Sequence, residues 1–409
     1  MSAKPAAARD NDVYAWLGVK KRINAAGLVT RLGGSLMSDE VFAAMREAGL
    51  HYVDISELQT QASAVIARHT GAQAGIVTSG AAAALTMATA ACIAGHDVAK
   101  MERLPDTEGM PNEVIMYRSH RNAYDHAVRA AGAKIREVGL NDRGAGAGVR
   151  ELEPWEIEAA ITANTVAVVY TVTPSGQPPL KDVTEVARRR NIPVIVDAAA
   201  QLPPKENLKA FIAAGASLVA FSGGKAIHGP QGTGILCGRK DLVSSALIQQ
   251  LDMDASPQTW DPPEGVLSPE LLKRYPHHGI GRGFKVDKES IVGLLVALER
   301  FANSDMTEEL KEKASFLQFI AERLRGAKHV RTAPAQAKGK GSYPALELII
   351  DEEALKRTAY EISKRLHQAS PPIHLSERRA HDGVLVVDSS GLRAGDERII
   401  ADALLSILT

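Results

Sequence analysis

Short apolar runs alternate with stretches of helical spacing through the middle of the chain. The runs occupy residues 75–79, 113–118, 165–172, 193–200 and 217–224, and helical patterns lie between them. Strands that alternate with helices in this way are typical of a parallel sheet with crossover helices. Since the runs are almost wholly apolar, both faces of the sheet should be covered. The pattern therefore predicts an α/β fold with a buried, mostly parallel sheet.

The pattern of apolar runs and helical spacing changes after about residue 265, which indicates a second, smaller domain. Residues 286–302 have helical spacing and are predicted to form a long helix that joins the two domains. Two more apolar runs and a closing helical pattern follow at residues 345–354, 384–390 and 397–408. We predict three parts: an N-terminal segment 1–45, a large domain 46–285 and a small α/β C-terminal domain 286–409.

Composition and charge narrow the class of protein. The 409 residues are 45% hydrophobic and 23% charged, close to the soluble globular average, which argues against a fibrous or disordered chain. The 48 basic side chains equal the 48 acidic ones, so no net positive field would attract nucleic acid or an anionic membrane. Two cysteines are too few for a disulfide framework or a zinc cluster, and we predict no metal site.

The chain also shows no sign of export or membrane insertion. Its N-terminus lacks the apolar stretch of a signal peptide. No apolar run reaches the length of about 18 residues that a membrane helix needs. The best candidate, Ala81–Gly95, is shorter and is predicted to be a buried helix. We therefore expect a cytoplasmic protein.

Polar residues follow the ends of several predicted strands. In sheets of this kind ligands bind at the carboxyl ends of the strands, so these residues are the first candidates for chemistry. They are Thr78, Ser79, Gly80, His120, Thr173, Asp197, Ser222 and Lys225. Their concentration at one edge of the sheet predicts a ligand site there.

Two of these candidates, Lys225 and Asp197, carry a charge. Lys225 follows an apolar strand and two glycines, which permit a tight turn and the close approach of another group. Its apolar neighbours would lower the pKa of the amine, as a Schiff-base lysine requires. Asp197 ends the preceding apolar strand, so its carboxylate needs a cationic partner or hydrogen bonds. The alternatives are a solvated surface lysine and a helix-capping aspartate.

The remaining candidates suit a flat, phosphorylated ligand. Residues 78–82 open a helix with small side chains, and N–H groups at a helix start bind anions, although a Ser-Gly pair there is also ordinary capping. Ser222 could add a hydroxyl to the same anion. His120 could stack on a ring or be an ordinary loop histidine, and Ala199 is small enough to admit a ring. An amine, a carboxylate and a phosphate site match the polar ends of pyridoxal 5'-phosphate.

Six stretches carry a family resemblance. They are RINAAGLVTRLGG, IVTSGAAAAL, RSHRNAYDHAVRAAGAKIREVG, PVIVDAAAQLPP, SGGKAIHGPQGTGIL and GIGRGFKVDKESIVGLLVALE. They resemble fold-type I pyridoxal phosphate enzymes, and more narrowly the selenocysteine synthase-like group that includes D-glucosaminate-6-phosphate ammonia-lyase. The resemblance implies an aspartate aminotransferase-like large domain. It also implies Lys225 as the Schiff-base residue, Asp197 at the pyridine nitrogen, and Ser79, Gly80, Ala81 and Ser222 at the phosphate.

The resemblance has further implications for partners and cofactor contacts. Thr173 stands near the place where related enzymes often have an asparagine, which leaves the contact to the cofactor's phenolic oxygen open. Family members place their sites at a dimer interface, so we expect at least a homodimer, in which Lys285 would reach the neighbouring subunit's phosphate. Only about 20 residues precede the matching region. Selenocysteine synthase has a sizeable tRNA-binding region there, so we do not expect a tRNA substrate.

These features favour an ammonia-lyase-like enzyme acting on a small 2-amino acid with a β-hydroxyl. The product would be a 2-oxo acid and ammonia, and the substrate's carboxylate or distal phosphate would bind an arginine. The candidate arginines, each of which could instead be a surface ion-pair residue, are Arg31, Arg282 and Arg393. A racemase, an aldolase or a transferase with the same cofactor is the alternative within enzymes. A catalytically silent assembly module is the alternative outside them.

Overall fold

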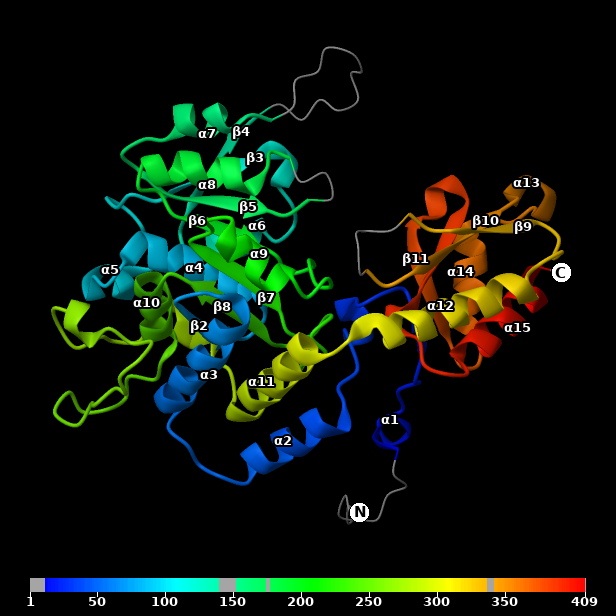
Figure 1. Cartoon of the computed structure of the whole chain (residues 1–409), viewed down its shortest axis with the longest axis horizontal. Coiled ribbons are helices and arrows are strands. Elements are labelled where there is room, and N and C mark those ends of the chain that lie inside the picture. The colour runs from blue at the N-terminus through cyan, green and yellow to red at the C-terminus, as the bar shows by residue number, and fades with distance from the viewer. Residues whose placement is uncertain (1–11, 140–151, 174–176, 337–341, 409) are drawn as a thin grey trace. The chain divides into compact units, whose positions relative to one another are not determined.

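The computed structural model describes residues 12–139, 152–173, 177–336 and 342–408 (Figure 1). The chain divides into two compact units. The larger unit is Ser35–Ser304, and the smaller unit combines Met1–Gly34 with Asp305–Thr409. Among the described residues, no helix combines the length and the apolar character needed to cross a lipid bilayer.

The larger unit is built on a seven-stranded sheet of order β2-β8-β7-β6-β5-β3-β4. In chain order the strands are β2 (Ala74–Thr78), β3 (Glu113–Tyr117), β4 (Lys134–Val138), β5 (Thr165–Thr171), β6 (Val194–Asp197), β7 (Leu218–Ser222) and β8 (Gly234–Gly238). All neighbours run parallel except the two pairs that β8 makes with β2 and β7. The predicted α/β fold with a buried, mostly parallel sheet is confirmed.

Helices connect and cover these strands. They are α2 (Asp39–Gly49), α3 (Ile55–Thr70), α4 (Ala81–Ala94), α5 (Val98–Arg103), α6 (Asp125–Ala130), α7 (Pro154–Ala160), α8 (Leu180–Arg189), α9 (Asn207–Ala213), α10 (Lys240–Gln250) and α11 (Lys288–Asn303), with short 3-10 turns η3 (Arg118–His120), η4 (Pro269–Leu271) and η5 (Ile280–Phe284). The crossover pattern read from the sequence therefore holds from β2 to β7 and ends at β8, which follows β7 without a helix between them.

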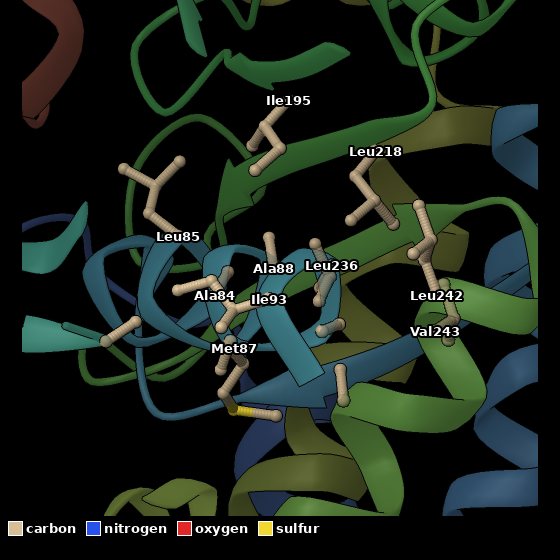
Figure 2. Close-up of a cluster of buried hydrophobic side chains, with 14 of the residues drawn as sticks. Ala84, Leu85, Met87, Ala88, Ile93, Ile195, Leu218, Leu236, Leu242 and Val243 are labelled. Atoms are coloured by element: carbon tan, nitrogen blue, oxygen red, sulfur yellow. The ribbon is translucent and has the colours of Figure 1, made fainter. Parts of the chain in front are cut away.

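Helix α4 lies at the centre of the larger unit's core. Its side chains are apolar or small nearly all round, so it suits burial on every side. Figure 2 shows Leu85, Met87 and Ala88 of α4 gathered with Leu218 of β7 and Leu236 of β8. The many alanines let the helix approach the sheet closely, because they add little volume. This packing fixes where α4 begins, at the carboxyl end of β2.

The smaller unit contains a five-stranded sheet of order β1-β11-β12-β10-β9. Its strands are β1 (Ile23–Ala25), β9 (Val330–Pro334), β10 (Ala345–Ile350), β11 (Ile373–Arg379) and β12 (Val384–Asp388). Its helices and 3-10 turns are α1 (Val13–Trp16), η2 (Thr30–Leu32), α12 (Met306–Arg323), α13 (Glu352–Leu355), α14 (Ala359–Gln368), η6 (Ala380–Asp382), η7 (Ser389–Gly391) and α15 (Asp396–Leu408). Strand β1 pairs in parallel with β11, so the N-terminal segment belongs to this unit.

The units differ from the predicted boundaries 1–45, 46–285 and 286–409. Helix α11 lies wholly in the larger unit, where it packs against α2. Gly293 permits this approach, since a Cβ there would lie 2.7 Å from Cγ of Met45. Residues 1–34 join the smaller unit because β1 pairs with a strand some 350 residues later. Helical spacing and a short strand do not reveal which distant neighbour an element packs on.

Candidate active site

Strand register gathers the predicted site residues at one edge of the larger sheet. Thr78, the last residue of β2, pairs with Gly234 of β8, and Gly234 pairs with Ser222, the last residue of β7. Asp197 ends β6 and pairs with Thr171, which ends β5. The carboxyl ends of four strands therefore meet along a single edge, which is where ligands bind in sheets of this type.

Asp197 is held in a partly buried position beside Lys225. The backbone N–H of Ala199 donates to its Oδ1 at 3.1 Å. Burial raises the pKa of the Asp197 carboxyl above its usual value, while the Ala199 hydrogen bond and the positive charge of Lys225 act in the opposite direction. Asp197 and Lys225 thus interact electrostatically, although neither is adjacent to the other in sequence. A buried carboxylate of this kind is stabilised by a further cationic or N–H partner.

Lys225 stands on a turn that only glycines permit. A Cβ at Gly224 would lie 2.4 Å from Cα of Gln231, and one at Gly223 would lie 2.2 Å from Oγ1 of Thr233. The chain therefore folds back tightly after β7 and returns as β8. Lys225 itself is half-buried. This turn presents a lysine directly at the edge where Asp197 ends its own strand.

The start of α4 forms an uncapped cradle of N–H groups. Its N-cap is Gly80, with φ +96°, and no side chain caps the first turn. A Cβ at Gly234 would lie 2.5 Å from the carbonyl carbon of Gly80 and 2.6 Å from the nitrogen of Ala81, so a glycine in β8 lets the two segments meet. Ala81 and Ala82 leave the turn open to solvent. Free N–H groups at a helix start bind anions, helped by the helix dipole.

The hydroxyl groups beside this cradle are partly committed to backbone carbonyls. Thr78 Oγ1 donates to Gly80 O at 3.0 Å and is buried, so its side chain shapes the turn. Ser79 Oγ donates to Phe284 O at 3.0 Å. A hydroxyl has a single proton to donate. Ser222 differs, since its hydroxyl makes no hydrogen bond within the described part of the chain.

A pair of buried glutamines, which the sequence did not single out, supports the same turn. Gln59 exchanges two hydrogen bonds with the backbone of Val77, at 2.9 and 3.0 Å. Its Nε2 also donates to Gln250 Oε1 at 3.3 Å, and Gln250 Nε2 donates to Phe284 O at 3.2 Å. Phe284 therefore joins this pair to Ser79. Glutamines in amphipathic helices give no sequence signal for such a role.

Lys285 follows Phe284 directly and is exposed. Since the Phe284 carbonyl accepts from Ser79, Lys285 lies next to the α4 cradle of its own chain. Its predicted reach to a neighbouring subunit's phosphate stays a prediction.

The stacking role of His120 stays a prediction. The side chain is 1% exposed, and its ring meets Tyr117 and Tyr170 edge-on at centroid distances of 5.3 and 4.7 Å. Its Nε2 lies 3.2 Å from Gln177 O. The ring is thus buried beside two tyrosines within its own subunit. A polar residue after a strand gives no indication of which way its side chain turns.

Thr173 and Ser35 lie beside the charged pair. Thr173 follows β5, and its neighbour Val172 donates its N–H to Asp197 O at 3.2 Å. Ser35 was missed by the sequence analysis: its N–H donates to Gly224 O at 3.1 Å, which places it against the Lys225 turn. Its Oγ is buried and has no hydrogen-bond partner within the described residues. The only sequence signal for Ser35 is that it directly follows the motif RINAAGLVTRLGG, and that motif belongs to the smaller unit.

The three candidate arginines have different surroundings. Arg282, in the larger unit, donates from Nη2 to Asp252 Oδ2 at 2.7 Å. Asp252 also forms an exposed group with Asp254 and His278, of a kind common without a metal, so we assign no metal site. Arg31 and Arg393 belong to the smaller unit. Arg31 Nη1 lies 3.3 Å from His374 Nδ1, and Arg393 is exposed.

Comparison with known proteins decides the family. Residues 43–261, more than half of the chain, match the family model described as aminotransferase class-V. The chain belongs to the aminotransferase class-V family. This assignment confirms the predicted fold-type I architecture.

Three kinds of relative cover most of the chain. The D-glucosaminate-6-phosphate ammonia lyase of Salmonella typhimurium is 29% identical over 404 residues, covering 97% of this chain and 98% of that protein. A solved D-glucosaminate-6-phosphate ammonia-lyase structure superposes with a TM-score of 0.80 at 28% identity, covering 98% of this chain and 99% of the other. The 5'-C-glycyluridine monooxygenase-decarboxylase of a Streptomyces species is 30% identical over 97% of this chain and 92% of its own.

The L-seryl-tRNA(Sec) selenium transferase of Nitratidesulfovibrio vulgaris is 25% identical and covers 87% of this chain and 75% of its own. The predicted resemblance to the selenocysteine synthase-like group is confirmed. The protein is an enzyme of the ammonia-lyase type, which confirms the prediction of an enzyme over an assembly module. Two relatives of nearly equal identity carry different reaction names, so the comparisons leave the substrate open.

Proposed function

We propose that this protein is a pyridoxal phosphate-dependent lyase that converts a small 2-amino acid with a β-hydroxyl into a 2-oxo acid and ammonia. The Cα–H bond and the Cβ–O bond break, and water leaves. The resulting enamine becomes an imine, and water then returns to hydrolyse it, so the reaction needs no oxidant or reductant. The observation that carries the proposal is the coupling of Asp197 to Lys225 at the strand edge, beside the open start of α4.

The site's residues fit the three polar ends of the cofactor. Burial leaves the Asp197 carboxylate in need of a cationic partner, which a protonated ring nitrogen would provide. The N–H groups of α4 suit a phosphate, and Lys225 offers an amine for the aldehyde. When bound, the cofactor supplies an electron sink for a substrate that loses its Cα proton.

The protein's own residues then have distinct tasks. The amine of Lys225 would take the Cα proton and hold it at Nζ. Asp197 keeps positive charge on the ring nitrogen, and the Ala199 N–H fixes the direction of that carboxylate. Ser222, with a hydroxyl that has no partner in the described chain, joins the α4 N–H groups at the phosphate. We further propose that Thr173 contacts the ring's phenolic oxygen.

The substrate class follows from the relative that this chain covers almost end to end. That relative is named for an amino sugar acid that carries both a carboxylate and a phosphate. Two anionic groups suit the arginines of this protein, since guanidinium binds each of them in a bidentate way. We therefore propose a small, phosphorylated amino sugar acid or a related β-hydroxy amino acid as the substrate.

We propose further that the protein works in the cytoplasm as a homodimer or larger homo-oligomer. The segment around α2 exposes a series of large apolar side chains within the larger unit: Leu36, Phe42, Leu50, Tyr52, Val53 and Ile55. Exposed apolar patches of this kind mark interaction surfaces. Sedimentation should give at least a dimer, and Leu50→Glu with Tyr52→Glu should shift it toward a monomer.

The cofactor proposal is tested by colour and covalent labelling. The purified protein, supplied with pyridoxal phosphate, should be yellow, and borohydride should bleach it and fix the label on Lys225. Peptide mass spectrometry locates the label. A protein that stays colourless and unlabelled would reject the proposal.

The reaction is tested by its products. D-glucosaminate 6-phosphate, D-serine, L-serine and L-threonine are supplied in turn, and ammonia and 2-oxo acid are measured in equal amounts. Exchange of the Cα proton for deuterium without ammonia would indicate a racemase instead. Cleavage of L-threonine to glycine and acetaldehyde would indicate an aldolase.

A further inference from the structure

The backbone adopts a left-handed conformation three residues after Lys225. His228 has φ +59° there. A Cβ disfavours this conformation, and glycine is its usual occupant. Within the described residues, three other non-glycine residues have a positive φ: Asn191, His329 and Lys356. His228 is the one of the four that follows Lys225 in the same turn. A strained backbone of this kind persists where contacts with the surroundings impose it.

The imidazole of His228 supplies one such contact. Its Nδ1 lies 2.9 Å from the carbonyl oxygen of Leu36. A carbonyl oxygen can only accept, so Nδ1 must carry a proton, and the neutral ring must be the Nδ1–H tautomer. The backbone N–H of His228 donates to Lys225 O at 2.9 Å and closes the turn that begins at Lys225. The ring therefore ties the end of this turn to Leu36.

The residue before Leu36 holds the start of the same turn. The Ser35 N–H donates to Gly224 O at 3.1 Å. Gly224 precedes Lys225 and His228 follows it, so two adjacent residues of one segment hold the chain on both sides of the lysine. We call these two hydrogen bonds, Ser35 N–H to Gly224 O and His228 Nδ1–H to Leu36 O, the clasp. All of its residues belong to the larger unit.

The loop around the clasp is closely packed. The Gly229 N–H donates to Gly223 O at 2.9 Å, and the Gly223 N–H donates to Thr233 O at 2.9 Å. A Cβ at Gly229 would lie 2.9 Å from Cδ1 of Leu294. The place of the Lys225 backbone is therefore set by the hydrogen bonds and contacts of its neighbours.

The backbone position of a lysine matters because its side chain is long. Four methylene groups separate the amine from Cα, so a small rotation of the turn moves Nζ by a larger distance. Misplacing a reacting group by about 1 Å can cost about 100-fold in rate. A residue that fixes the turn can therefore control the chemistry of the amine without touching the substrate.

We propose that His228 is a positioning residue for Lys225, which it directs by holding the turn to Leu36 through Nδ1–H. The inference rests on the proposed function, in which the Lys225 amine binds the cofactor's aldehyde and takes the Cα proton. It assigns His228 no contact with the substrate. A histidine that only stabilised the loop would affect folding and leave the reactivity of Lys225 unchanged.

Two substitutions separate the hydrogen bond from the backbone conformation. Glycine adopts a positive φ freely and asparagine tolerates it, so neither His228→Gly nor His228→Asn should strain the turn. Asparagine Nδ2 is bonded to Cγ, as histidine Nδ1 is, and can donate to Leu36 O in its place, whereas glycine has no donor there. His329→Gly is the matched control, because His329 is also left-handed, with φ +65°, and belongs to the smaller unit.

Steady-state kinetics give the first readout, with any supplied substrate that the wild type deaminates. His228→Gly should lower kcat by about 30-fold and leave KM within about 3-fold, because the amine is misdirected and the binding groups remain. His228→Asn should stay within about 3-fold of the wild type in both constants. His329→Gly should match the wild type. If His228→Gly matched the wild type, or His228→Asn lost as much as His228→Gly, the inference would be wrong.

Two further readouts do not depend on turnover. Before pyridoxal phosphate is added, the Ser35 amide of His228→Gly should exchange with deuterium about 10-fold faster than in the wild type, because half of the clasp is lost. After it is added, the label that borohydride fixes on Lys225 should form about 10-fold more slowly. His228→Asn and His329→Gly should resemble the wild type in both. Faster exchange with an unchanged rate of labelling would reduce His228 to a structural role and overturn the inference.

The tautomer of His228 tests the geometry directly. In ¹⁵N-histidine spectra, the signals that disappear in His228→Asn identify its ring. The neutral ring should carry its proton on Nδ1, as the Leu36 carbonyl requires. A neutral ring protonated on Nε2 alone would contradict the clasp.

Failure of the inference and failure of the proposed function look different. If the wild type is labelled on Lys225 and releases ammonia, while His228→Gly is labelled and turns over at the wild-type rates, the inference is wrong and the function stands. If the wild type stays unlabelled and releases no ammonia, the function is wrong and the positioning role falls with it.

Discussion

The two ends of the candidate site are built from different materials. At the β6 and β7 end, the site consists of charged side chains: Asp197 and Lys225 interact across neighbouring strand ends. At the β2 and β8 end, the site consists of backbone groups. Helix α4 offers uncapped N–H groups, and Gly234 lets β8 approach the turn at Gly80 closely. The first end should be sensitive to changes of charge. The second should be sensitive to added volume and less sensitive to changes of charge.

The largest effect is expected at the charged end. Lys225→Ala should lower kcat by about 1000-fold or more, because it removes the nucleophilic amine. Lys225→Arg keeps the positive charge but should lose as much, which shows that the amine itself is needed. Borohydride labelling should be absent in both variants. Activity within 10-fold of the wild type in either one would mean that this end has been assigned wrongly.

Asp197→Asn should have the next largest effect, with kcat lower by about 100-fold, since the side chain keeps its size and loses the charge that supports the ring nitrogen. The cofactor's absorbance spectrum should change, although the protein remains coloured. Asp241→Asn, at an exposed carboxylate paired with Arg239, is the matched control and should leave kcat unchanged. If Asp197→Asn and Asp241→Asn lowered kcat equally, the assignment of Asp197 to the ring nitrogen would be wrong.

At the backbone end, Gly234→Ala should weaken cofactor binding by about 10-fold, because overpacking costs on the order of 1–3 kcal/mol. The added Cβ would lie 2.5 Å from the carbonyl carbon of Gly80. Gly232→Ala is the control two residues away, where a Cβ would meet nothing within 4 Å. Fluorescence titration with pyridoxal phosphate measures both. Identical dissociation constants would contradict the backbone-built cradle.

The smallest effect distinguishes the two serines of the cradle. Ser79 already donates to Phe284 O, so Ser79→Ala should weaken cofactor binding by less than about 3-fold. Ser222 has no such partner in the described chain, and Ser222→Ala should weaken binding by about 5- to 10-fold through loss of a hydrogen bond to a charged group. The reverse order would show that Ser79 rotates to face the phosphate.

Local sequence was sufficient for the strands and for the polar residues that follow them. Near-continuous apolar runs identify buried parallel strands, and the carboxyl end of each strand is known once the strand is known. The sequence alone therefore places Asp197 and Lys225 on one edge of the sheet. The confirmed fold rests on this short-range information, in which periodicity of two or near four residues reports secondary structure.

Side-chain direction and long-range partners were beyond the sequence. His120 follows its strand as predicted, yet its ring turns inward between Tyr117 and Tyr170. Gln59 and Gln250 look like ordinary helix residues and become a buried hydrogen-bond pair only because β2 and η5 pack against them. Such contacts join residues separated by nearly two hundred positions, and no local pattern records them.

By itself, then, the order of amino acids determined the class of fold, the sheet edge that carries chemistry and the identities of its lysine and aspartate. Tertiary structure decided that residues 1–34 join the C-terminal unit, that α11 belongs to the larger one, and that Arg31 meets His374. The physical reason is the distance along the chain over which each kind of interaction acts. Hydrophobic periodicity acts over one or two turns, whereas strand pairing and burial depend on whichever distant groups the fold brings into contact.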